Sequence, residues 1–388
     1  MIKFMGLIFL LIVISPPSAM GGGVTIKSHW KRPISVNPSF SAEDLHPEKC
    51  NPCHEGRYRD WSASLHSRSV GPGLTAQLDP EADPGFAMSC YFCHAPLSMQ
   101  NEIKPGGPSA GGYIRNESFD KRLKGSGVSC ASCHFRRAQV YGPTAPRAEG
   151  VEGSKKADHA SLEKSFFERS EFCAACHQLD AGYRVNGKLL VNTYMEWKES
   201  LYGKRNITCQ ICHMPGRRHL FKGIHDPAMT KSAVTFTAEW SKTPPSARLT
   251  ITNSGAGHYF PTYTTPQVVI RGYRLDSKGS KIKGSVKEAF IGRKLPVDLS
   301  MELFDTRIAP FKSFIFDYPL KGKGYGRAEK LVFEVKVYPD EFYNRFYKAS
   351  LKGDVGNKGA EFREALKNTN LSPYTLFKKE FLLNEQLG

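Results

Sequence analysis

The segment Cys50-Asn51-Pro52-Cys53-His54 decides how this chain folds, because its Cys-x-x-Cys-His pattern returns four more times. The further copies start at Cys90, Cys130, Cys173 and Cys209, and we number the five copies motif 1 to motif 5 in chain order. Together they contain every cysteine in the chain, 10 in all. A pattern that recurs in this way and leaves no cysteine over indicates one chemical task repeated along the chain.

Cys-x-x-Cys-His is the attachment signature of c-type haem. The two thiols bond covalently to the haem, and the adjacent histidine binds the iron from one side. We therefore predict five covalently attached haems c. The expected cofactor-binding residues are Cys50, Cys53, Cys90, Cys93, Cys130, Cys133, Cys173, Cys176, Cys209 and Cys212. The expected proximal iron ligands are His54, His94, His134, His177 and His213.

Other uses of the cysteines stay open at this point. Disulfides are common in secreted chains, but they give no reason for a histidine after every second cysteine. Zinc sites and redox dithiols also use Cys-x-x-Cys pairs, but zinc sites would combine the motifs in twos, and the number of motifs is odd. If haem is attached, both thiols of each motif are consumed and no disulfide can form.

The N-terminal residues have the features of a secretory signal. Lys3 is followed by an apolar run over residues 4–14 and then by small residues that include Ser18 and Ala19. This order is typical of a signal peptide, and the run is too short to span a bilayer. We expect residues 1–20 to be a cleaved signal and the mature protein to be periplasmic or extracellular. An uncleaved N-terminal anchor is the alternative.

The chain is basic, with 54 Lys and Arg residues against 37 Asp and Glu residues and a formal net charge of +17. Haem propionates would offset part of this charge. A basic surface attracts acidic partners by electrostatic steering. The expected partners are redox proteins, with acidic or membrane-associated proteins as candidates, and nucleic acid is not expected for a secreted haem protein.

The motifs divide the chain unevenly, since all of them lie between residues 50 and 213. Their first cysteines recur about every 40 residues, too few to build a conventional core for each haem. We therefore expect the porphyrins to form the core, wrapped by short helices and irregular chain.

From residue 233 onward, alternating apolar segments punctuated by turn residues predict an antiparallel β-sandwich. After Pro339 the apolar spacing becomes helical. The expected strands cover 234–240, 248–252, 268–275, 286–291, 313–318 and 331–337. The predicted fold class is α+β and multidomain. Its expected parts are the signal peptide (1–20), a haem-packed domain (21–230), the β-sandwich (231–340) and a helical C-terminal tail (341–388).

One internal repeat is more specific than the motif spacing. Tyr58-Arg59-Asp60-Trp61-Ser62-Ala63-Ser64-Leu65-His66 matches Tyr194-Met195-Glu196-Trp197-Lys198-Glu199-Ser200-Leu201-Tyr202. The tyrosine and tryptophan, three residues apart, fall on one helical face. The two copies end differently, in His66 and in Tyr202. A tyrosine there could face an open iron, but we favour packing against a porphyrin.

A carrier haem needs a second strong axial ligand, usually histidine or methionine. Seven histidines lie outside the motifs, enough for five irons. We expect most of them to bind iron, although the sequence does not assign any to a particular haem. The expected distal ligands are His66, His219, His258, His225, His159 and His46, with His29 as the remaining histidine. Met88, Met99 and Met214 are the alternatives.

The region from His46 to about Asp226 resembles the multihaem cytochromes c related to hydroxylamine oxidoreductase and its tetrahaem electron acceptor. The resemblance rests on the five motifs, on both copies of the repeat, and on motif 5 continuing into Met214-Pro215. Residues 256–262, with residues 305–310 further on, look like a β-sandwich module appended to secreted multihaem cytochromes. The resemblance implies closely packed haems, mostly with two histidine ligands, that pass electrons.

The chain departs from the enzymes of this family in two respects. Pentahaem nitrite reductases have a lysine in place of one proximal histidine, whereas all five motifs here end in histidine. Hydroxylamine oxidoreductases carry eight haems. We therefore expect an electron carrier more than a catalytic oxidoreductase, and we predict no catalytic residue.

Our leading hypothesis is extracytoplasmic electron transfer through five haems. The first alternative is an oxidoreductase with one open haem that reduces a small nitrogen or sulfur oxyanion. The second is a homo-oligomer or extracellular filament, in which His29 or His46 would bind an iron of a neighbouring subunit.

Overall fold

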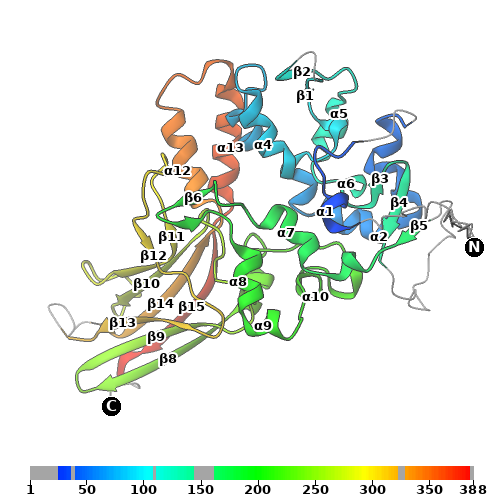
Figure 1. The fold of residues 1–388 in the computed structure, drawn as a ribbon. Coiled ribbons are helices and arrows are strands. Elements are labelled where there is room, and N and C mark those ends of the chain that lie inside the picture. Colours follow the sequence, from blue (N-terminus) through cyan, green and yellow to red (C-terminus); the bar gives the residue numbers. More distant parts are fainter. Residues whose placement is uncertain (1–24, 36–39, 108–110, 144–160, 322–327, 385–388) are drawn as a thin grey trace, which may run out of the picture.

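The fold was obtained as a computed structural model, which describes residues 25–35, 40–107, 111–143, 161–321 and 328–384. The expected signal peptide and His159 lie outside these residues. The described chain has the predicted α+β class, with short helices first, antiparallel sheets next and a helical region near the C-terminus (Figure 1). In the described residues, no helix is long and apolar enough to cross a membrane.

The first half of the chain consists of short helices joined by irregular segments. Its α-helices are α1 (Ile26–His29), α2 (Asn51–Ser62), α3 (Pro72–Gln77), α4 (Pro84–His94), α5 (Lys121–Gly125), α6 (Cys130–His134), α7 (Glu171–His177), α8 (Thr193–Glu199), α9 (Leu201–Lys204), α10 (Cys209–His213) and α11 (Pro227–Ala233). Its 3-10 helices are η1 (Glu43–Leu45), η2 (Pro47–Lys49), η3 (His66–Arg68), η4 (Ser98–Gln100), η5 (Ser165–Glu168) and η6 (Pro215–Arg217). Its small strands are β1 (Ile103–Pro105), β2 (Tyr113–Arg115), β3 (Phe135–Arg136), β4 (Gln139–Gly142), β5 (Ser161–Glu163), β6 (Arg184–Val185) and β7 (Lys188–Leu189).

Every motif histidine lies where a helix ends or breaks. Helices α4, α6, α7 and α10 each end at the histidine of their motif. Helix α2 continues past its motif, but His54 leaves the helical conformation at φ −123° and ψ 38°. Capping side chains fix the starts of several helices, as where Asp83 accepts from the amide of Phe86 at 3.0 Å. Each motif is therefore a short helical turn whose histidine lies at the point where the chain changes direction.

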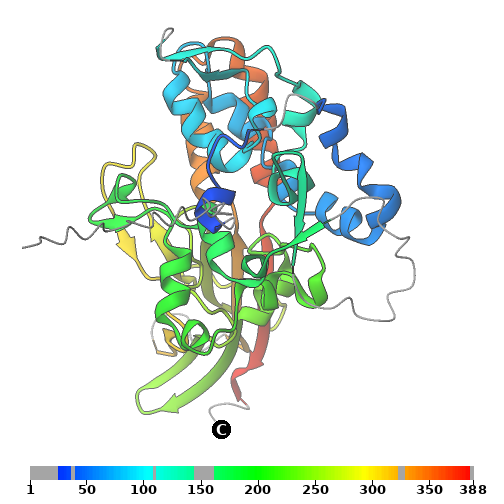
Figure 2. The ribbon, with the colours of Figure 1, turned by 45° about the vertical axis from the view of Figure 1, so that its right-hand side comes forward.

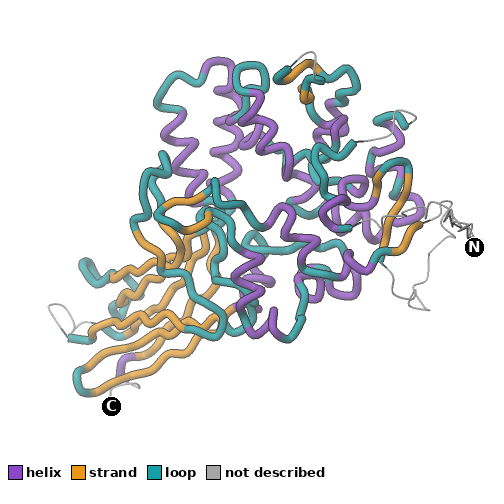
Figure 3. The backbone as a smooth tube through the Cα atoms, in the orientation of Figure 1, coloured by secondary structure: helices purple, strands orange, loops and turns teal. Residues whose placement is uncertain are grey.

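The apolar core of this region is divided into small pieces. One cluster gathers Ile34, Leu45, Leu97 and Leu123, and another gathers Leu78, Met88 and Tyr91. In the described residues, the larger cluster lies in the sandwich instead. Figure 3 shows that the long strands are gathered in one body and that most of the helices lie in the other. The haem region has the divided core that the short motif spacing predicts.

The predicted β-sandwich is present and has two antiparallel sheets in the described residues. Their strands are β8 (Val234–Lys242), β9 (Pro245–Asn253), β10 (Gln267–Leu275), β11 (Lys287–Lys294), β12 (Phe304–Asp305), β13 (Ser313–Pro319), β14 (Lys330–Tyr338) and β15 (Tyr374–Leu382). The strand orders are β12-β11-β10-β14-β15 and β13-β9-β8. Ile251 lies opposite Phe236 and Phe314 in the second sheet, and Ile270 lies opposite Val335 in the first. These side chains alternate inward and meet in one core, as the period of two requires.

The C-terminal tail differs from the expectation at its end. Residues after Pro339 form α12 (Glu341–Ser350), η8 (Gly356–Lys358) and α13 (Gly359–Leu371), as predicted. The chain then forms β15, a strand and not a helix, which pairs with β14 in antiparallel register. The reason is its apolar pattern, because Phe377 and Phe381 pack against the sandwich core while the lysines between them stay exposed.

Helices α12 and α13 pack against the haem region. Tyr347 and Phe362 share a cluster with Ala76 of α3. Figures 1 and 2 place α13 beside α4, and in Figure 1 α12 lies on the other side of α13. The approach is close at Gly73, where an added Cβ would lie 2.2 Å from the Tyr347 hydroxyl. The tail therefore joins the two halves of the molecule.

Candidate haem sites

Three motif histidines lie opposite three histidines from elsewhere in the chain. In each pair the two ring centres are separated by 6.1–6.4 Å. The pairs are His134 with His219 at 6.1 Å, His177 with His66 at 6.1 Å, and His213 with His258 at 6.4 Å. Each pair combines one expected proximal ligand with one expected distal ligand.

This spacing fits an iron held between the two rings. A metal–imidazole bond is about 2 Å long, and each ring centre lies about 1 Å beyond its bonding nitrogen. Two imidazoles on opposite sides of one iron therefore have ring centres about 6 Å apart. The histidine pairs at motifs 3, 4 and 5 thus have the ring separation that a haem with two histidine ligands requires.

The hydrogen bonds of these rings leave the correct nitrogen for the iron. In five of the six paired rings, Nδ1 is the atom that contacts a neighbouring oxygen, so Nδ1 carries the proton and Nε2 keeps its lone pair. The carbonyl acceptors belong to Tyr141 for His134 (2.8 Å), Lys222 for His213 (2.7 Å), Arg217 for His219 (3.1 Å) and Tyr259 for His258 (2.9 Å). For His177 the acceptor is the hydroxyl of Tyr263. His94 of motif 2 likewise contacts the carbonyl of Ser69 at 2.9 Å.

Burial keeps the paired rings neutral, which is the state that binds a metal. Desolvation lowers the pKa of His66 to about 3 and that of His177 and His219 to about 4. Desolvation also lowers the pKa values of the other three paired histidines. None of these rings needs to lose a proton at neutral pH before it binds iron.

The remaining expected ligands contact oxygen through Nε2 instead. His225 lies 2.9 Å from Asp340 through this nitrogen, and His46 lies 3.5 Å from Asp120. The Nε2 atom of His29 lies 2.8 Å from the carbonyl of Cys133, inside a group of aromatic rings. In the described residues, none of these three rings forms a pair with a motif histidine like those above, so their roles as ligands stay predictions.

The internal repeat positions two of the motifs. The indole N–H of Trp61 donates to the carbonyl of Val128, and that of Trp197 donates to the carbonyl of Ile207, both at 2.8 Å. Each carbonyl belongs to the residue two places before the first cysteine of a motif, motif 3 in one case and motif 5 in the other. The repeat is therefore a structural unit that fixes the start of a motif.

The two copies of the repeat differ in the role of their last residue. His66 lies opposite His177 of motif 4, whereas the Tyr202 hydroxyl donates to the carbonyl of Ser254 at 3.2 Å. The Tyr202 ring also stacks on Phe311, with ring centres 5.4 Å apart. Tyr202 thus joins α9 to the sandwich, and its expected packing against a porphyrin stays a prediction.

The sandwich contributes directly to two motifs. Its β9–β10 loop carries both His258, opposite His213, and Tyr263, bonded to His177. Glu196 of α8 holds this loop by accepting from the amide of Tyr259 at 3.1 Å and from the Thr262 hydroxyl at 2.7 Å.

A chain of ion pairs anchors the same junction. Arg307 contacts Glu196 at 2.9 Å, and it also contacts Asp305, which pairs with Lys188 at 2.9 Å. Another ion pair holds the loop of His219, where Arg218 donates to Asp60 of α2 at 2.8 Å.

The motifs also contact one another through their cysteines. The side chains of Cys50 and Cys130 lie in contact, as do those of Cys93 and Cys176, and those of Cys173 and Cys209. Cys133 lies close enough to Cys173 and Cys176 to interact electrostatically. Motif 3 therefore neighbours motifs 1 and 4, and motif 4 neighbours motifs 2 and 5.

Arg32 lies between motifs 2 and 4. Its guanidinium donates to the carbonyls of Phe92 and Ala175, and Nη1 lies 3.3 Å from the sulfur of Cys93 and 3.4 Å from that of Cys176. Sequence reasoning identified neither Arg32 nor Tyr263. Tyr263 had one signal, its position in the same loop as His258, and Arg32 had none.

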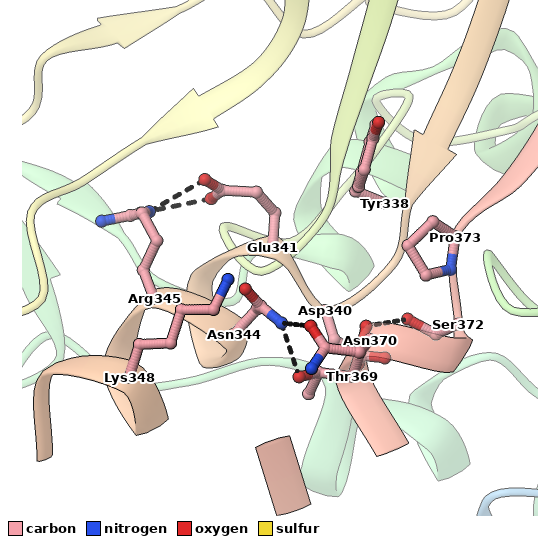
Figure 4. A pocket seen from close by; sticks show the side chains of 10 residues that line it. All are labelled: Tyr338, Asp340, Glu341, Asn344, Arg345, Lys348, Thr369, Asn370, Ser372 and Pro373. Carbon is pink, nitrogen blue, oxygen red and sulfur yellow. Dashed lines mark hydrogen bonds and ion pairs between the residues drawn. The ribbon is translucent and has the colours of Figure 1, made fainter. Parts of the chain in front are cut away.

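A separate polar pocket of about 260 Å³ lies where β14, α12 and α13 meet (Figure 4). Asn344 donates across it to Thr369 at 2.9 Å, and Arg345 pairs with Glu341 at 2.8 Å. No motif residue lines this pocket. We therefore assign it no part in the haem sites.

Comparisons with known proteins relate part of the sequence to a cytochrome family and the fold to a solved structure. Residues 49–135, which contain motifs 1 to 3, match the family model described as cytochrome c554 and c-prime. The structure is similar to a penta-haem cytochrome c552 from Thermochromatium tepidum, with a TM-score of 0.56 and 18% sequence identity. The match covers 89% of this chain and 100% of that one, so the two share a fold. No curated protein matches the sequence.

Proposed function

We propose that this chain is a multihaem cytochrome c that transfers electrons through five covalently bound haems outside the cytoplasm. The family match over motifs 1 to 3 and the shared fold support this proposal. The haem irons supply the chemistry, which is the gain and loss of single electrons. The chain supplies the attachment points, the axial ligands and the spacing. The predicted signal peptide supports the location, since c-type haem is attached outside the cytoplasm.

The observation that carries this proposal is the set of three histidine pairs. We propose that His219, His66 and His258 are the distal ligands at motifs 3, 4 and 5, which their ring separations support. An iron with two firm imidazole ligands has no position left for a substrate. Such an iron exchanges electrons without binding anything new, which is the property of a carrier.

The contacts between motifs support a branched electron route. We propose that electrons pass along motifs 1, 3, 4 and 5, and that motif 2 joins this route at motif 4. The cysteine contacts between motifs 1 and 3, 2 and 4, and 4 and 5 favour this order. Motif 4 would then be the junction of the array.

The basic charge supports acidic redox proteins as partners. A filament in which His29 or His46 binds an iron of a neighbouring subunit has less support, because each of these side chains is only 1% exposed. Either histidine would have to leave its buried position to reach another molecule.

Carbon monoxide tests the proposal, because it binds reduced haem iron that has an open or weakly held position. We expect the absorption spectrum of the reduced protein to stay the same when carbon monoxide is added. A change in about one fifth of the haem absorbance would mean that one of the five irons is open. In that case the protein would not be a carrier alone, because the open iron could bind a substrate.

One observation favours a second candidate function at motif 2. In the part of the chain that the structure describes, no histidine ring pairs with His94 as others pair with the histidines of motifs 3, 4 and 5. The buried hydroxyl of Tyr343 lies near Cys90 of this motif. An oxidoreductase that reduces a small oxyanion would therefore have its open iron at motif 2, not beside Tyr202.

The same carbon monoxide experiment separates the two functions. If one iron is open, turnover with nitrite or sulfite can be measured in the wild-type protein and in Tyr343→Phe. A loss of turnover in the variant with an unchanged carbon monoxide spectrum would support catalysis at motif 2. Equal turnover in both proteins would argue against this site.

A further inference from the structure

Arg32 brings a positive charge to the junction of motifs 2 and 4. It bridges the two motifs by donating to a backbone carbonyl in each, at Phe92 and at Ala175. Its Nη1 atom also reaches Cys93 and Cys176, the second cysteine of each motif, at 3.3 and 3.4 Å. After haem attachment these sulfurs are thioethers at the edges of two haems, so the charge of Arg32 lies beside both.

A fixed positive charge beside a haem favours the reduced iron, which carries one positive charge less than the oxidised iron. The site is partly buried, so solvent screens this charge less than it would screen a surface charge. Arg32 should therefore raise the reduction potentials of the haems at motifs 2 and 4. The neighbouring Lys31 also carries a positive charge, but its side chain is exposed, so solvent screens that charge.

Motif 4 also differs from motifs 2, 3 and 5 in the hydrogen bond of its proximal histidine. Three proximal histidines, His94, His134 and His213, donate their Nδ1 proton to a backbone carbonyl. His177 donates instead to the hydroxyl of Tyr263. A phenol oxygen is a weaker acceptor than a peptide carbonyl, so the His177 imidazole stays less basic, and a less basic axial ligand favours reduced iron.

We propose that Arg32 and Tyr263 are positioning residues that together set the reduction potential of the haem at motif 4. Arg32 raises this potential, and Tyr263 lowers it less than the backbone carbonyls do at motifs 2, 3 and 5, so this haem is the centre where electrons collect. The inference rests on the proposed electron-transfer function and adds to it the place where the branch from motif 2 meets the main route. Tyr263 belongs to the sandwich, so the sandwich acts on the potential of a haem that the first half of the chain binds.

The test is a potentiometric titration of the purified holoprotein, in which the five haems titrate as separate one-electron steps. Arg32→Gln should lower two of the five potentials, because the charge lies beside two haems. Arg32→Lys keeps the charge and should retain most of the wild-type values. Lys31→Gln is the matched control, since it removes the same charge from the next residue, and it should shift no single haem.

Tyr263→Phe should raise one potential, because Nδ1 of His177 then has no acceptor there. Tyr113→Phe is the control, since it removes the hydroxyl of an exposed tyrosine that lies in none of the motifs. In the double variant Arg32→Gln/Tyr263→Phe, one haem should carry both shifts and one should carry only the downward shift. This pattern identifies motif 4 without prior assignment of the potentials.

Two outcomes would overturn the inference. One is that Arg32→Gln and Lys31→Gln give the same five potentials to within a tenfold change in the reduction equilibrium, about 59 mV for one electron. The other is that Tyr263→Phe shifts none. Failure of the proposed function looks different, because an open iron would show as carbon monoxide binding in the wild-type protein whatever the potentials of the variants are.

Discussion

His258 in the sandwich lies opposite His213 of motif 5, with ring centres 6.4 Å apart and ring planes within 12° of parallel. His213 belongs to the haem region and His258 to the sandwich. Asn253 helps to hold His258 in place by donating its side-chain amide to the His258 carbonyl at 2.9 Å. The sandwich is therefore a part of the haem array as well as a neighbour of it.

Removal of the His258 ring should open one iron. In His258→Ala we expect carbon monoxide to change about one fifth of the haem absorbance of the reduced protein, because motif 5 then lacks its opposing imidazole. Free imidazole should reverse the change by filling the vacated position. A carbon monoxide spectrum identical to that of the wild-type protein would show that His258 is not a ligand.

The backbone of the same loop should be sensitive to a single methyl group. A Cβ at Gly255 would lie 2.1 Å from the carbonyl oxygen of Ser232, so Gly255→Ala must move the loop that carries His258. We expect a loss of about 1–3 kcal/mol in the free energy of unfolding, the usual cost of overpacking. Denaturant titration measures this loss.

Gly223→Ala is the control for Gly255→Ala, because its added Cβ would have nothing within 4 Å. The control should keep the wild-type unfolding midpoint. Equal midpoints for the two variants would mean that the contact at Ser232 relaxes without cost and that the loop is not held tightly there.

The sandwich could be predicted from sequence because its signal is local. Each predicted strand overlaps the observed one, as 313–318 does with Ser313–Pro319, since a half-buried strand shows its period of two within a few residues. Strand β15 was not predicted because its partner β14 precedes it by two helices. Its exposed lysines and glutamate also interrupt the apolar pattern.

In the haem sites, too, the residues with a local sequence pattern could be predicted and the others could not. The proximal residues could be predicted because both thiols and the histidine of a motif must lie on one turn of chain. The distal partners could be named but not assigned, because His66 meets His177 across 111 residues of folded chain. Arg32 carries no local pattern at all, since its contacts exist only after motifs 2 and 4 have come together.

Stability at acid pH should depend on Asp305 in the junction between the halves. Burial alone would raise the pKa of Asp305, but hydrogen bonds from Arg307 and Lys188 outweigh it and lower the pKa to about 2. Because the pKa is lower in the folded state, this carboxylate stabilises the protein above its unfolded-state pKa of about 3.9. The stabilisation is lost as the pH falls from about 4 to about 2.

Asp305→Asn tests this contribution. At pH 6 we expect the variant to lose about 2 kcal/mol of unfolding free energy relative to the wild-type protein, and at pH 2 the difference should nearly vanish. The comparison cancels the protonation of other groups, which both proteins share. A difference that does not change with pH would mean that Asp305 is not held as an ion pair in solution.

The two tryptophans of the repeat should contribute equally to stability. Trp61→Phe leaves the Val128 carbonyl without its indole donor, and Trp197→Phe does the same to Ile207. An unsatisfied buried carbonyl costs about 1–3 kcal/mol, so each variant should unfold at a lower denaturant concentration. Trp240→Phe is the control for the change in ring size, since the Trp240 ring packs edge-on against Phe381. If Trp61→Phe and Trp197→Phe cost no more than Trp240→Phe, the repeat would be only a packing pattern, and the starts of motifs 3 and 5 would be fixed by other contacts.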